Sequence, residues 1–337
     1  MEDQKLIAQY KRAKDILDKA HTIVILQADN PDGDSLASAL AMESILAEMG
    51  KEPIMVCGID MPAHLRYLDG WDRVEKDVPS KFDASIIVDA STISLFETLG
   101  KNGQLPWVKA KPVIILDHHV SSDGIDFATV SIIERAVSTG EVIYSLAKSQ
   151  GMPLPLDAMN FISVSIMSDS LGLTSEGTTV RAIRIIADVV EAGVSLSELD
   201  AARRELMKRE PELIGYKGQL LQRVEFYDDG RIATITIPWA EIERYSNIYN
   251  PSMLAIDDMR MTIGVGVCIA FKVYNNGRVT AKIRCNPGSV VADKLAAAFG
   301  GGGHPYAAGF KVLKNDDFAS LKAEVIQKAT ELLNQNT

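Results

Sequence analysis

Short apolar runs alternate with longer amphipathic stretches through the first half of the chain, beginning with an amphipathic helix expected over residues 1–19. Buried strands are predicted where apolar and β-branched residues follow one another, at 22–27, 53–57, 84–90 and 112–117. Helical periodicity fills residues 36–49, 140–150, 156–169 and 178–192, and Asp34 or Ser35 is expected to cap the first of these helices. The alternation predicts an α/β fold with a doubly wound, mostly parallel sheet.

The pattern changes near residue 195. Residues 195–222 are charged and helical in pattern, and Pro211 fits near the start of a helix, so we expect a connecting helix there. Further strands are predicted at 231–237, 263–273 and 278–284, and helices at 290–299 and 317–333 flank a short strand at 308–312. The turn from Tyr274 to Gly277 predicts a hairpin. The expected organisation is a first domain over 1–194, the helix over 195–222, and a smaller mixed α/β domain over 223–337.

Composition agrees with two globular domains. The chain has 337 residues, which exceeds the usual size of one domain, and its 47% hydrophobic and 24% charged residues are ordinary values. A net charge of -10 argues against a protein that coats long nucleic acid, but it allows a small anionic substrate. Three distant cysteines, the lack of an export signal and the lack of a membrane-length apolar run favour a cytoplasmic protein.

Acidic residues recur where predicted strands end. Asp32 and Asp34 follow the first strand, Asp89 lies at the end of the third, and Asp117 closes the fourth. The carboxyl ends of parallel strands meet at one edge of an open α/β sheet, so these carboxylates are expected to lie close together. Taken singly, each is most often a helix cap or a solvated turn residue; their recurrence indicates a site.

Histidine is concentrated at the same place. Of the five histidines, His118 and His119 directly follow the fourth strand, and His304 ends a run of four glycines. Carboxylates with an imidazole suit manganese or magnesium better than zinc, and Asp169 at a helix end can complete such a site. Two ions about 3.5 to 4 Å apart would clamp a phosphoryl group, which leaves His119 for phosphate contact or proton transfer.

Five segments, in this order, resemble the DHH phosphoesterase superfamily with its DHH-associated C-terminal domain. They are NPDGD at 30–34, VDAS at 88–91, LDHH at 116–119, SDS at 168–170 and GGGGHPYAAG at 300–309. The likeness covers nearly the whole chain and is greatest to the nanoRNase and pAp-phosphatase branch. It implies a hydrolase whose first domain binds metal and whose second domain binds substrate.

Site residues follow from the same resemblance. It implies one metal held by Asp32 and Asp89, and another held by Asp34, Asp89, His118 and Asp169. It also places His119 near the scissile phosphate, with Asp117 behind the ligands. In the second domain it implies that Arg284 grips a phosphate, and that Gly301, Gly302, Gly303 and His304 form an anion site.

Ala28 departs from the family pattern. The family usually has a histidine four residues before the first motif aspartate, and its exopolyphosphatase and prune branch has asparagine there. Gln27 or Asp29 could substitute, but adjacent strand residues point to opposite faces, which disfavours both. We therefore expect two Mn²⁺ or Mg²⁺ ions, with the first site weakened.

These observations favour a two-metal phosphodiesterase or phosphomonoesterase acting on short oligonucleotides, linear dinucleotides or pAp-type nucleotides. One alternative, motivated by Ala28, is a degenerate nucleotide-binding protein with weak or no hydrolysis. A second, a RecJ-like single-strand exonuclease, is disfavoured by the acidic charge. Neither a membrane nor long DNA is expected as a partner, and a homodimer is compatible with the sequence.

Overall fold

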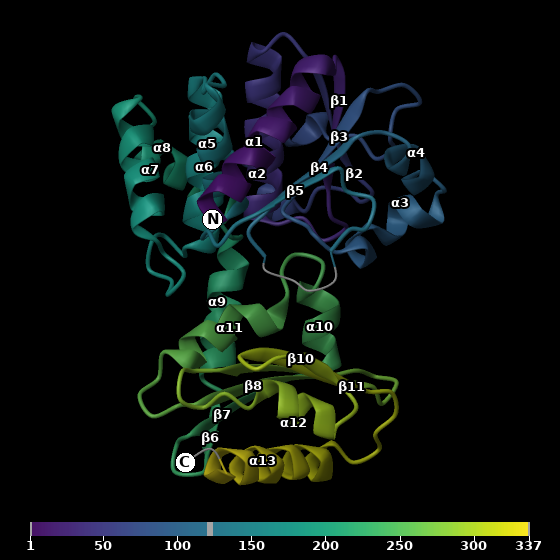
Figure 1. The fold of residues 1–337 in the computed structure, drawn as a ribbon. Coiled ribbons are helices and arrows are strands. Elements are labelled where there is room, and N and C mark those ends of the chain that lie inside the picture. Colours follow the sequence, from purple (N-terminus) through teal and green to yellow (C-terminus); the bar gives the residue numbers. More distant parts are fainter. Residues whose placement is uncertain (1, 120–123, 336–337) are drawn as a thin grey trace. The chain divides into compact units, whose positions relative to one another are not determined.

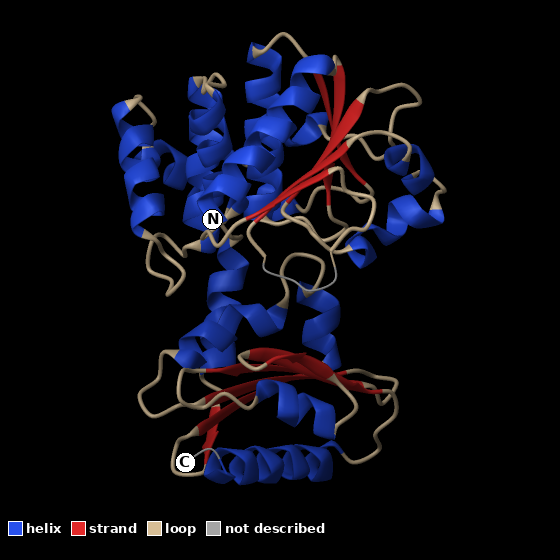
Figure 2. Ribbon diagram, viewed as in Figure 1, coloured by secondary structure: helices blue, strands red, loops and turns tan. Residues whose placement is uncertain are grey.

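The computed structural model describes residues 2–119 and 124–335, and it divides the chain into two compact units, Met1–Lys208 and Arg209–Thr337. Each unit contains one β-sheet with helices packed against it (Figures 1 and 2). The expected α/β class, with a parallel sheet first and a mixed sheet second, is confirmed. Among the described residues, no helix is both long enough and apolar enough to cross a membrane.

The first unit is organised around a five-stranded parallel sheet with the strand order β2-β1-β3-β4-β5. Its strands are β1 (Thr22–Gln27), β2 (Glu52–Cys57), β3 (Ala84–Val88), β4 (Val113–Asp117) and β5 (Val130–Ile133). The first four strands lie where the apolar runs predict them. The edge strand β5 was not predicted, because its four residues alternate between buried and half-buried and form no continuous apolar run.

Helices cover both faces of this sheet (Figure 2). One face packs against the helices α1 (Glu2–Lys19), α2 (Gly33–Glu48) and α5 (Thr139–Gln150). Helices α6 (Leu156–Asp169) and α7 (Val180–Glu191) pack in turn against these helices. The other face packs against η3 (Ile93–Phe96), α3 (Glu97–Lys101) and α4 (Leu105–Lys109). Two further short turns are η1 (Ala63–Leu65) and η2 (Trp71–Arg73). In β1, Ile23 faces the first group and Val24 the second, as strand alternation requires.

Helix α2 starts earlier than expected. Asp32, not Asp34 or Ser35, is the N-cap: its backbone is extended, and its carboxylate accepts a hydrogen bond of 3.0 Å from the Ser35 amide. The predicted cap is therefore wrong. Because the helix already includes Asp34, that carboxylate is fully buried in the first turn.

The single connecting helix predicted over 195–222 is also wrong. The structure has two helices there, α8 (Leu196–Leu206) and α9 (Pro211–Leu221), and the two compact units divide between them. Pro211 is the first residue of α9. Glu210, immediately before it, has an extended backbone with ψ of 139°, because a residue preceding proline is forced out of the helical region.

The second unit contains a six-stranded sheet with the order β10-β11-β9-β8-β7-β6. The strands are β6 (Glu225–Tyr227), β7 (Ile232–Ile237), β8 (Val267–Val273), β9 (Val279–Cys285), β10 (Gly302–His304) and β11 (Ala307–Val312). The predicted β8–β9 hairpin is present, with Gly277 at a φ of 77° in its turn. Strands β7 and β8 are parallel, however, and are joined by two helices that were not predicted, α10 (Trp239–Tyr245) and α11 (Pro251–Arg260).

The two faces of this second sheet differ. Helices α12 (Ala292–Ala298) and α13 (Phe318–Gln335) pack on one face, where Ala281 and Ile283 of β9 are buried. Helices α9, α10 and α11 cover part of the other. By strand alternation, that second face also carries Lys282 and Arg284, which are half-buried.

Candidate metal centre

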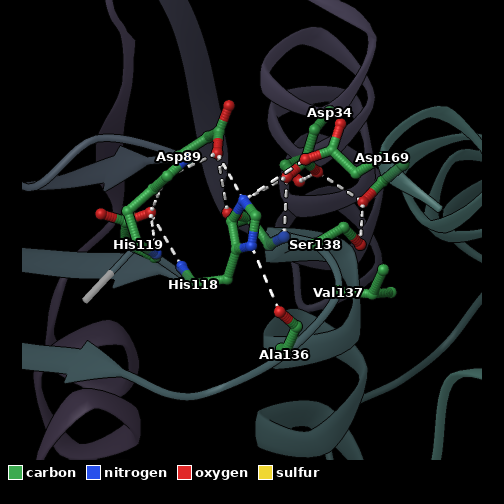
Figure 3. Close-up of polar contacts among 12 residues, drawn as sticks. Asp34, Asp89, His118, His119, Ala136, Val137, Ser138 and Asp169 are labelled. Atoms are coloured by element: carbon green, nitrogen blue, oxygen red, sulfur yellow. Dashed lines mark hydrogen bonds and ion pairs between the residues drawn. The ribbon is translucent and has the colours of Figure 1, made fainter. Parts of the chain in front are cut away.

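Three neighbouring strands, β1, β3 and β4, deliver polar side chains to the carboxyl edge of the first sheet. Asp34 lies in the helix that follows β1, and Asp89 directly follows β3. Asp117 is the last residue of β4, and His118 and His119 directly follow it. Asp169, the last residue of α6, joins them from outside the sheet. Figure 3 shows the His118 imidazole between Asp89 on one side and Asp34 and Asp169 on the other.

His118 is oriented as a metal ligand would be. Its Nδ1 lies 3.3 Å from the carbonyl oxygen of Ala136, which can only accept, so Nδ1 carries the proton and Nε2 presents a lone pair. Nε2 lies 3.5 Å from Asp34 Oδ2, 3.5 Å from Asp89 Oδ1 and 3.4 Å from Asp169 Oδ2. It is buried and lacks a hydrogen-bond partner among the described residues. An unpaired lone pair facing three carboxylates fits a bound cation.

Asp34 is fixed by hydrogen bonds on both oxygens. Oδ1 accepts from the hydroxyls of Ser38 (3.0 Å) and Ser165 (2.5 Å), and Oδ2 accepts from the Thr139 amide (2.8 Å). The close approach of α6 favours glycine at position 33, since a Cβ there would lie 2.4 Å from Ser168 Oγ and 3.1 Å from Ser168 Cβ. Burial raises the pKa of Asp34 above its ordinary value.

Asp89 occupies a strained backbone position. Its φ of 56° lies in the left-handed region, which aspartate tolerates better than most residues but at a cost of about 1 kcal/mol. Thr139 Oγ1 donates to its Oδ1 at 3.2 Å. Burial raises the pKa of Asp89 well above its ordinary value, and the carboxylates of Asp34 and Asp32 raise it further.

Asp169 completes a group of mutually repelling carboxylates. Burial, followed by the charges of Asp34 and Asp32, raises the pKa of Asp169 to about 7. Within the described part of the chain, no lysine or arginine lies within ion-pair distance of Asp34, Asp89 or Asp169. Carboxylate oxygens with one imidazole suit Mn²⁺ or Mg²⁺, and such an ion would offset the repulsion. The residues present therefore fit a divalent cation.

Asp117 holds the segment that carries the two histidines. Its buried Oδ1 accepts from the amides of His118 (2.8 Å) and His119 (3.1 Å) and from His119 Nδ1 (2.8 Å). The hydrogen bond from His119 Nδ1 to Asp117 raises the pKa of His119, whose side chain is 58% exposed. Burial acts to raise the pKa of Asp117, but hydrogen bonds from His119 and Ser91 outweigh it and hold that pKa low. His119 Nε2 is thereby left to meet a ligand.

Asp32 lies apart from the tightest clusters. The acidic and histidine ligand atoms that lie within 4.8 Å of one another form two groups, Asp34 with His118 and Asp169, and Asp89 with Asp117, His118 and His119. Asp32 belongs to neither of these groups of described residues. It is exposed, and with Asp89 it lines a hollow of about 290 Å³ whose wall includes Ala28.

Neither neighbour of Ala28 lines this hollow. The Asp29 carboxylate accepts a hydrogen bond of 2.8 Å from the Thr98 amide of α3, so it is engaged away from the other acids. Gln27 is fully buried, and by strand alternation it faces the side opposite Ala28. The side chain that residue 28 contributes to the wall of this hollow is therefore an alanine methyl group, which cannot bind a metal.

The expected substrate residues lie in the second unit. Arg284 in β9 and His304 in β10 both lie across from Ala307 in the register of β11, and Arg284 Nη1 donates to its neighbouring carbonyl. A Cβ at Gly301 or Gly303 would lie 2.2 Å or 2.6 Å from the backbone of β11, so packing alone requires those two glycines. Gly302 has no such contact within 4 Å.

Several supporting residues were not predicted. Thr139 binds both Asp34 and Asp89, Ser165 binds Asp34, and the Ala136 carbonyl fixes His118. These groups are neutral and lie far from their partners in sequence. The one available indication was the helix start next to Thr139, where hydroxyl residues commonly gather.

Two family domains match the chain. Residues 22–166 match the DHH family, N-terminal domain, and residues 240–335 match the DHHA1 domain. The chain belongs to the DHH superfamily of phosphoesterases, as the sequence motifs predict.

Two of the relatives come from the branch that the motifs favour. The chain is 26% identical to the bifunctional oligoribonuclease and PAP phosphatase NrnA of Thermus thermophilus, covering 98% of this chain and 95% of the relative. It is 22% identical to the protein of the same description from Bacillus subtilis, covering 90% and 93%. The fold is similar to that of an exopolyphosphatase-related protein from Bacteroides fragilis, with a TM-score of 0.79, 20% identity and coverage of 97% and 98%.

Proposed function

We propose that this protein is a metal-dependent phosphoesterase that hydrolyses short oligonucleotides, linear dinucleotides or pAp-type nucleotides. The observation that carries the proposal is the convergence of Asp34, Asp89 and Asp169 on the unprotonated nitrogen of His118. Support for the substrate class comes from two relatives that match over most of their length and are named oligoribonuclease and PAP phosphatase.

The ligand sets are unequal. Asp34, Asp89, His118 and Asp169 would hold one ion, while Asp32 and Asp89 would offer a second ion only two side chains, beside the hollow at Ala28. We expect the first set to bind manganese or magnesium more tightly. Such an ion, when bound by these residues, would lower the pKa of a bound water and polarise a phosphoryl oxygen.

His119 is the proposed proton-transfer and phosphate-contact residue. Asp117 accepts from Nδ1 and raises the pKa of His119, so the protonated imidazole is more stable here than in a free histidine side chain. A protonated ring can donate from Nε2 to a phosphate oxygen or to the departing oxygen. Asp117 positions this ring without contacting the reacting atoms.

A second candidate function is nucleotide binding without hydrolysis. The observation that favours it is Ala28, which leaves the site of Asp32 and Asp89 with no third side chain. Processive digestion of long single strands is less favoured, since the chain carries a net charge of -10.

The three cysteines are buried and unpaired, which supports our placing the protein in the cytoplasm.

One assay tests the proposal and its alternatives. Purified protein with Mn²⁺ or Mg²⁺ is incubated with pAp, dinucleotides, linear and cyclic dinucleotide messengers, and oligonucleotides of increasing length. We expect hydrolysis of the short substrates, rates that fall with length, and loss of hydrolysis in Asp34→Asn. Binding of these nucleotides without product release would support the second candidate. Undiminished trimming of long strands would contradict the preference for short substrates.

A further inference from the structure

A second hollow, of about 470 Å³, lies entirely within the second unit. Its walls come from the first turn of α11, from strands β8, β9 and β11, and from the start of the glycine run. The residues that matter for its chemistry are Ser252, Lys272, Thr280 and Lys282. Arg284 and His304 are not among its lining residues, but Gly301 is, so the pocket adjoins the substrate positions that the family motifs indicate and adds two lysines that those motifs do not include. We call it the lysine pocket.

The lysine pocket has unmet positive charge. Lys272 of β8 and Lys282 of β9 are both half-buried, and no described carboxylate lies within ion-pair distance of either. The Lys282 ammonium lies 3.6 Å from the sulfur of Met253, which is a weak hydrogen-bond acceptor. Lys311 also lines the pocket, and no acidic residue does. Burial lowers the pKa of both Lys272 and Lys282, and the charge of Lys282 lowers that of Lys272 further.

A helix terminus adds to this field. Helix α11 has ten residues, and Asn250 caps it by accepting from the Ser252 amide at 3.3 Å. The Ser252 hydroxyl is buried and has no hydrogen-bond partner among the described residues. Helix N-termini favour anions, so the two ammonium groups and the start of α11 favour the same sign of ligand.

We propose that the lysine pocket binds a phosphate group of a substrate that carries more than one. Lys282 and Arg284 project from the same face of β9 two residues apart, which separates them by about 7 Å along the strand. Neighbouring phosphates of one short nucleotide chain can then be held by the lysine pocket and by Arg284. The identification of the anion as substrate phosphate rests on the proposed function; the pocket itself does not.

The test measures binding in EDTA, where hydrolysis cannot occur. A 5′-phosphorylated trinucleotide is titrated by calorimetry at several salt concentrations. We expect Lys282→Gln to bind about tenfold more weakly and Lys272→Gln/Lys282→Gln about a hundredfold more weakly. The slope of log affinity against log salt should fall by about 0.7 for each lost contact. The matched control is Lys314→Gln, an exposed lysine outside the pocket, which should bind as wild type does.

Folding is controlled separately. Because Lys272 and Lys282 are partly desolvated without a partner, their replacement should leave the unliganded melting temperature unchanged or higher. Trinucleotide affinity and salt slope equal to wild type in the folded double variant would overturn the inference. Inorganic phosphate is the second probe. Lysine-dependent binding of phosphate, together with lysine-independent binding of the trinucleotide, would overturn the assignment to substrate.

Hydrolysis with Mn²⁺ distinguishes this inference from the proposed function. If wild type hydrolyses short nucleotides and the double variant binds them equally well, only the lysine pocket assignment fails. If wild type binds the trinucleotide through the lysines but hydrolyses nothing, only the proposed function fails.

Discussion

The two units concentrate opposite charges on their sheets. At the carboxyl edge of the first sheet, Asp34, Asp89 and Asp169 lie together without a lysine or arginine partner among the described residues. On one face of the second sheet, Lys272 and Lys282 are half-buried without a carboxylate partner in the described chain. Buried charge of one sign is costly unless a ligand of the other sign offsets it. The first unit therefore fits a cation and the second an anion.

The largest effect is expected at Asp89. Asp89→Asn keeps the side-chain shape but removes the charge that lies 3.5 Å from His118 Nε2 and 3.6 Å from His119 Nδ1. We expect kcat/KM to fall about 10³-fold or more. Calorimetry should show weaker Mn²⁺ binding in the same variant. Asp72→Asn, at an exposed position of the same unit, is the control and should change neither quantity. Wild-type rates at saturating metal in Asp89→Asn would contradict the ligand assignment.

Stability of the metal-free protein should depend on pH through the same carboxylates. The pKa of Asp169 is about 7 when folded, against about 3.9 in an unfolded chain. Its contribution is therefore fully present below about pH 4 and is lost as the pH rises through about 7. Since the side chain is 25% exposed, we expect Asp169→Asn to be more stable than wild type at pH 8 by about 2 kcal/mol.

Thermal unfolding in EDTA between pH 4 and pH 8 measures this difference. The two proteins should unfold at similar temperatures at pH 4, where Asp169 is neutral in wild type, and diverge as the pH rises. Added Mn²⁺ should raise the melting temperature of wild type more than that of the variant. Parallel pH profiles for the two proteins would show that the carboxylates do not repel one another as described.

Arg284 tests the anion side of the comparison. Arg284→Ala should raise the Michaelis constant for substrates with a terminal phosphate about twentyfold, because a charged hydrogen bond is lost while the metal centre is untouched. Mn²⁺ affinity, measured by calorimetry, should stay at the wild-type value. A defect that extra manganese cures would assign Arg284 to the metal centre instead.

Ala28→His should give the smallest effect. It would add a third ligand beside Asp32 and Asp89 in the first unit. The hollow beside Asp32 and Asp89 has room for an imidazole, and a third ligand there should tighten the weaker Mn²⁺ event about tenfold. If wild type already hydrolyses, only the metal requirement should change. If wild type is inert and the variant hydrolyses, the natural protein is a binder. No change in metal binding would mean that position 28 does not face the ion.

The sequence predicts the three inner strands of the first sheet well, because β1, β3 and β4 are buried on both faces. The run over 22–27 becomes β1 at the same residues. The sequence predicts β5 and β10 poorly, since four and three residues carry too little periodicity. The split between α8 and α9 depends on the effect of Pro211 on the preceding residue, which outweighs a continuous helical pattern.

The candidate site, like the fold, is predictable from the sequence only in part. The convergence of the strand-end acids follows from the order of parallel strands, which the apolar runs predict. The cap at Asp32 and the contacts of Thr139 do not follow from the strand order. They depend on where a helix begins and on which helices meet. Asp34 and Thr139 are 105 residues apart, and neither the charge nor the periodicity of the sequence connects them.

The left-handed backbone at Asp89 has a consequence for protein engineering. Glycine adopts a φ of 56° without strain, and Asp89→Gly also removes a desolvated charge from a crowded group. A directed-evolution campaign that selects this protein for heat resistance alone should therefore enrich Asp89→Gly and deliver robust but inactive clones. Selecting on turnover at each round, or fixing codon 89 in the library, would prevent that outcome.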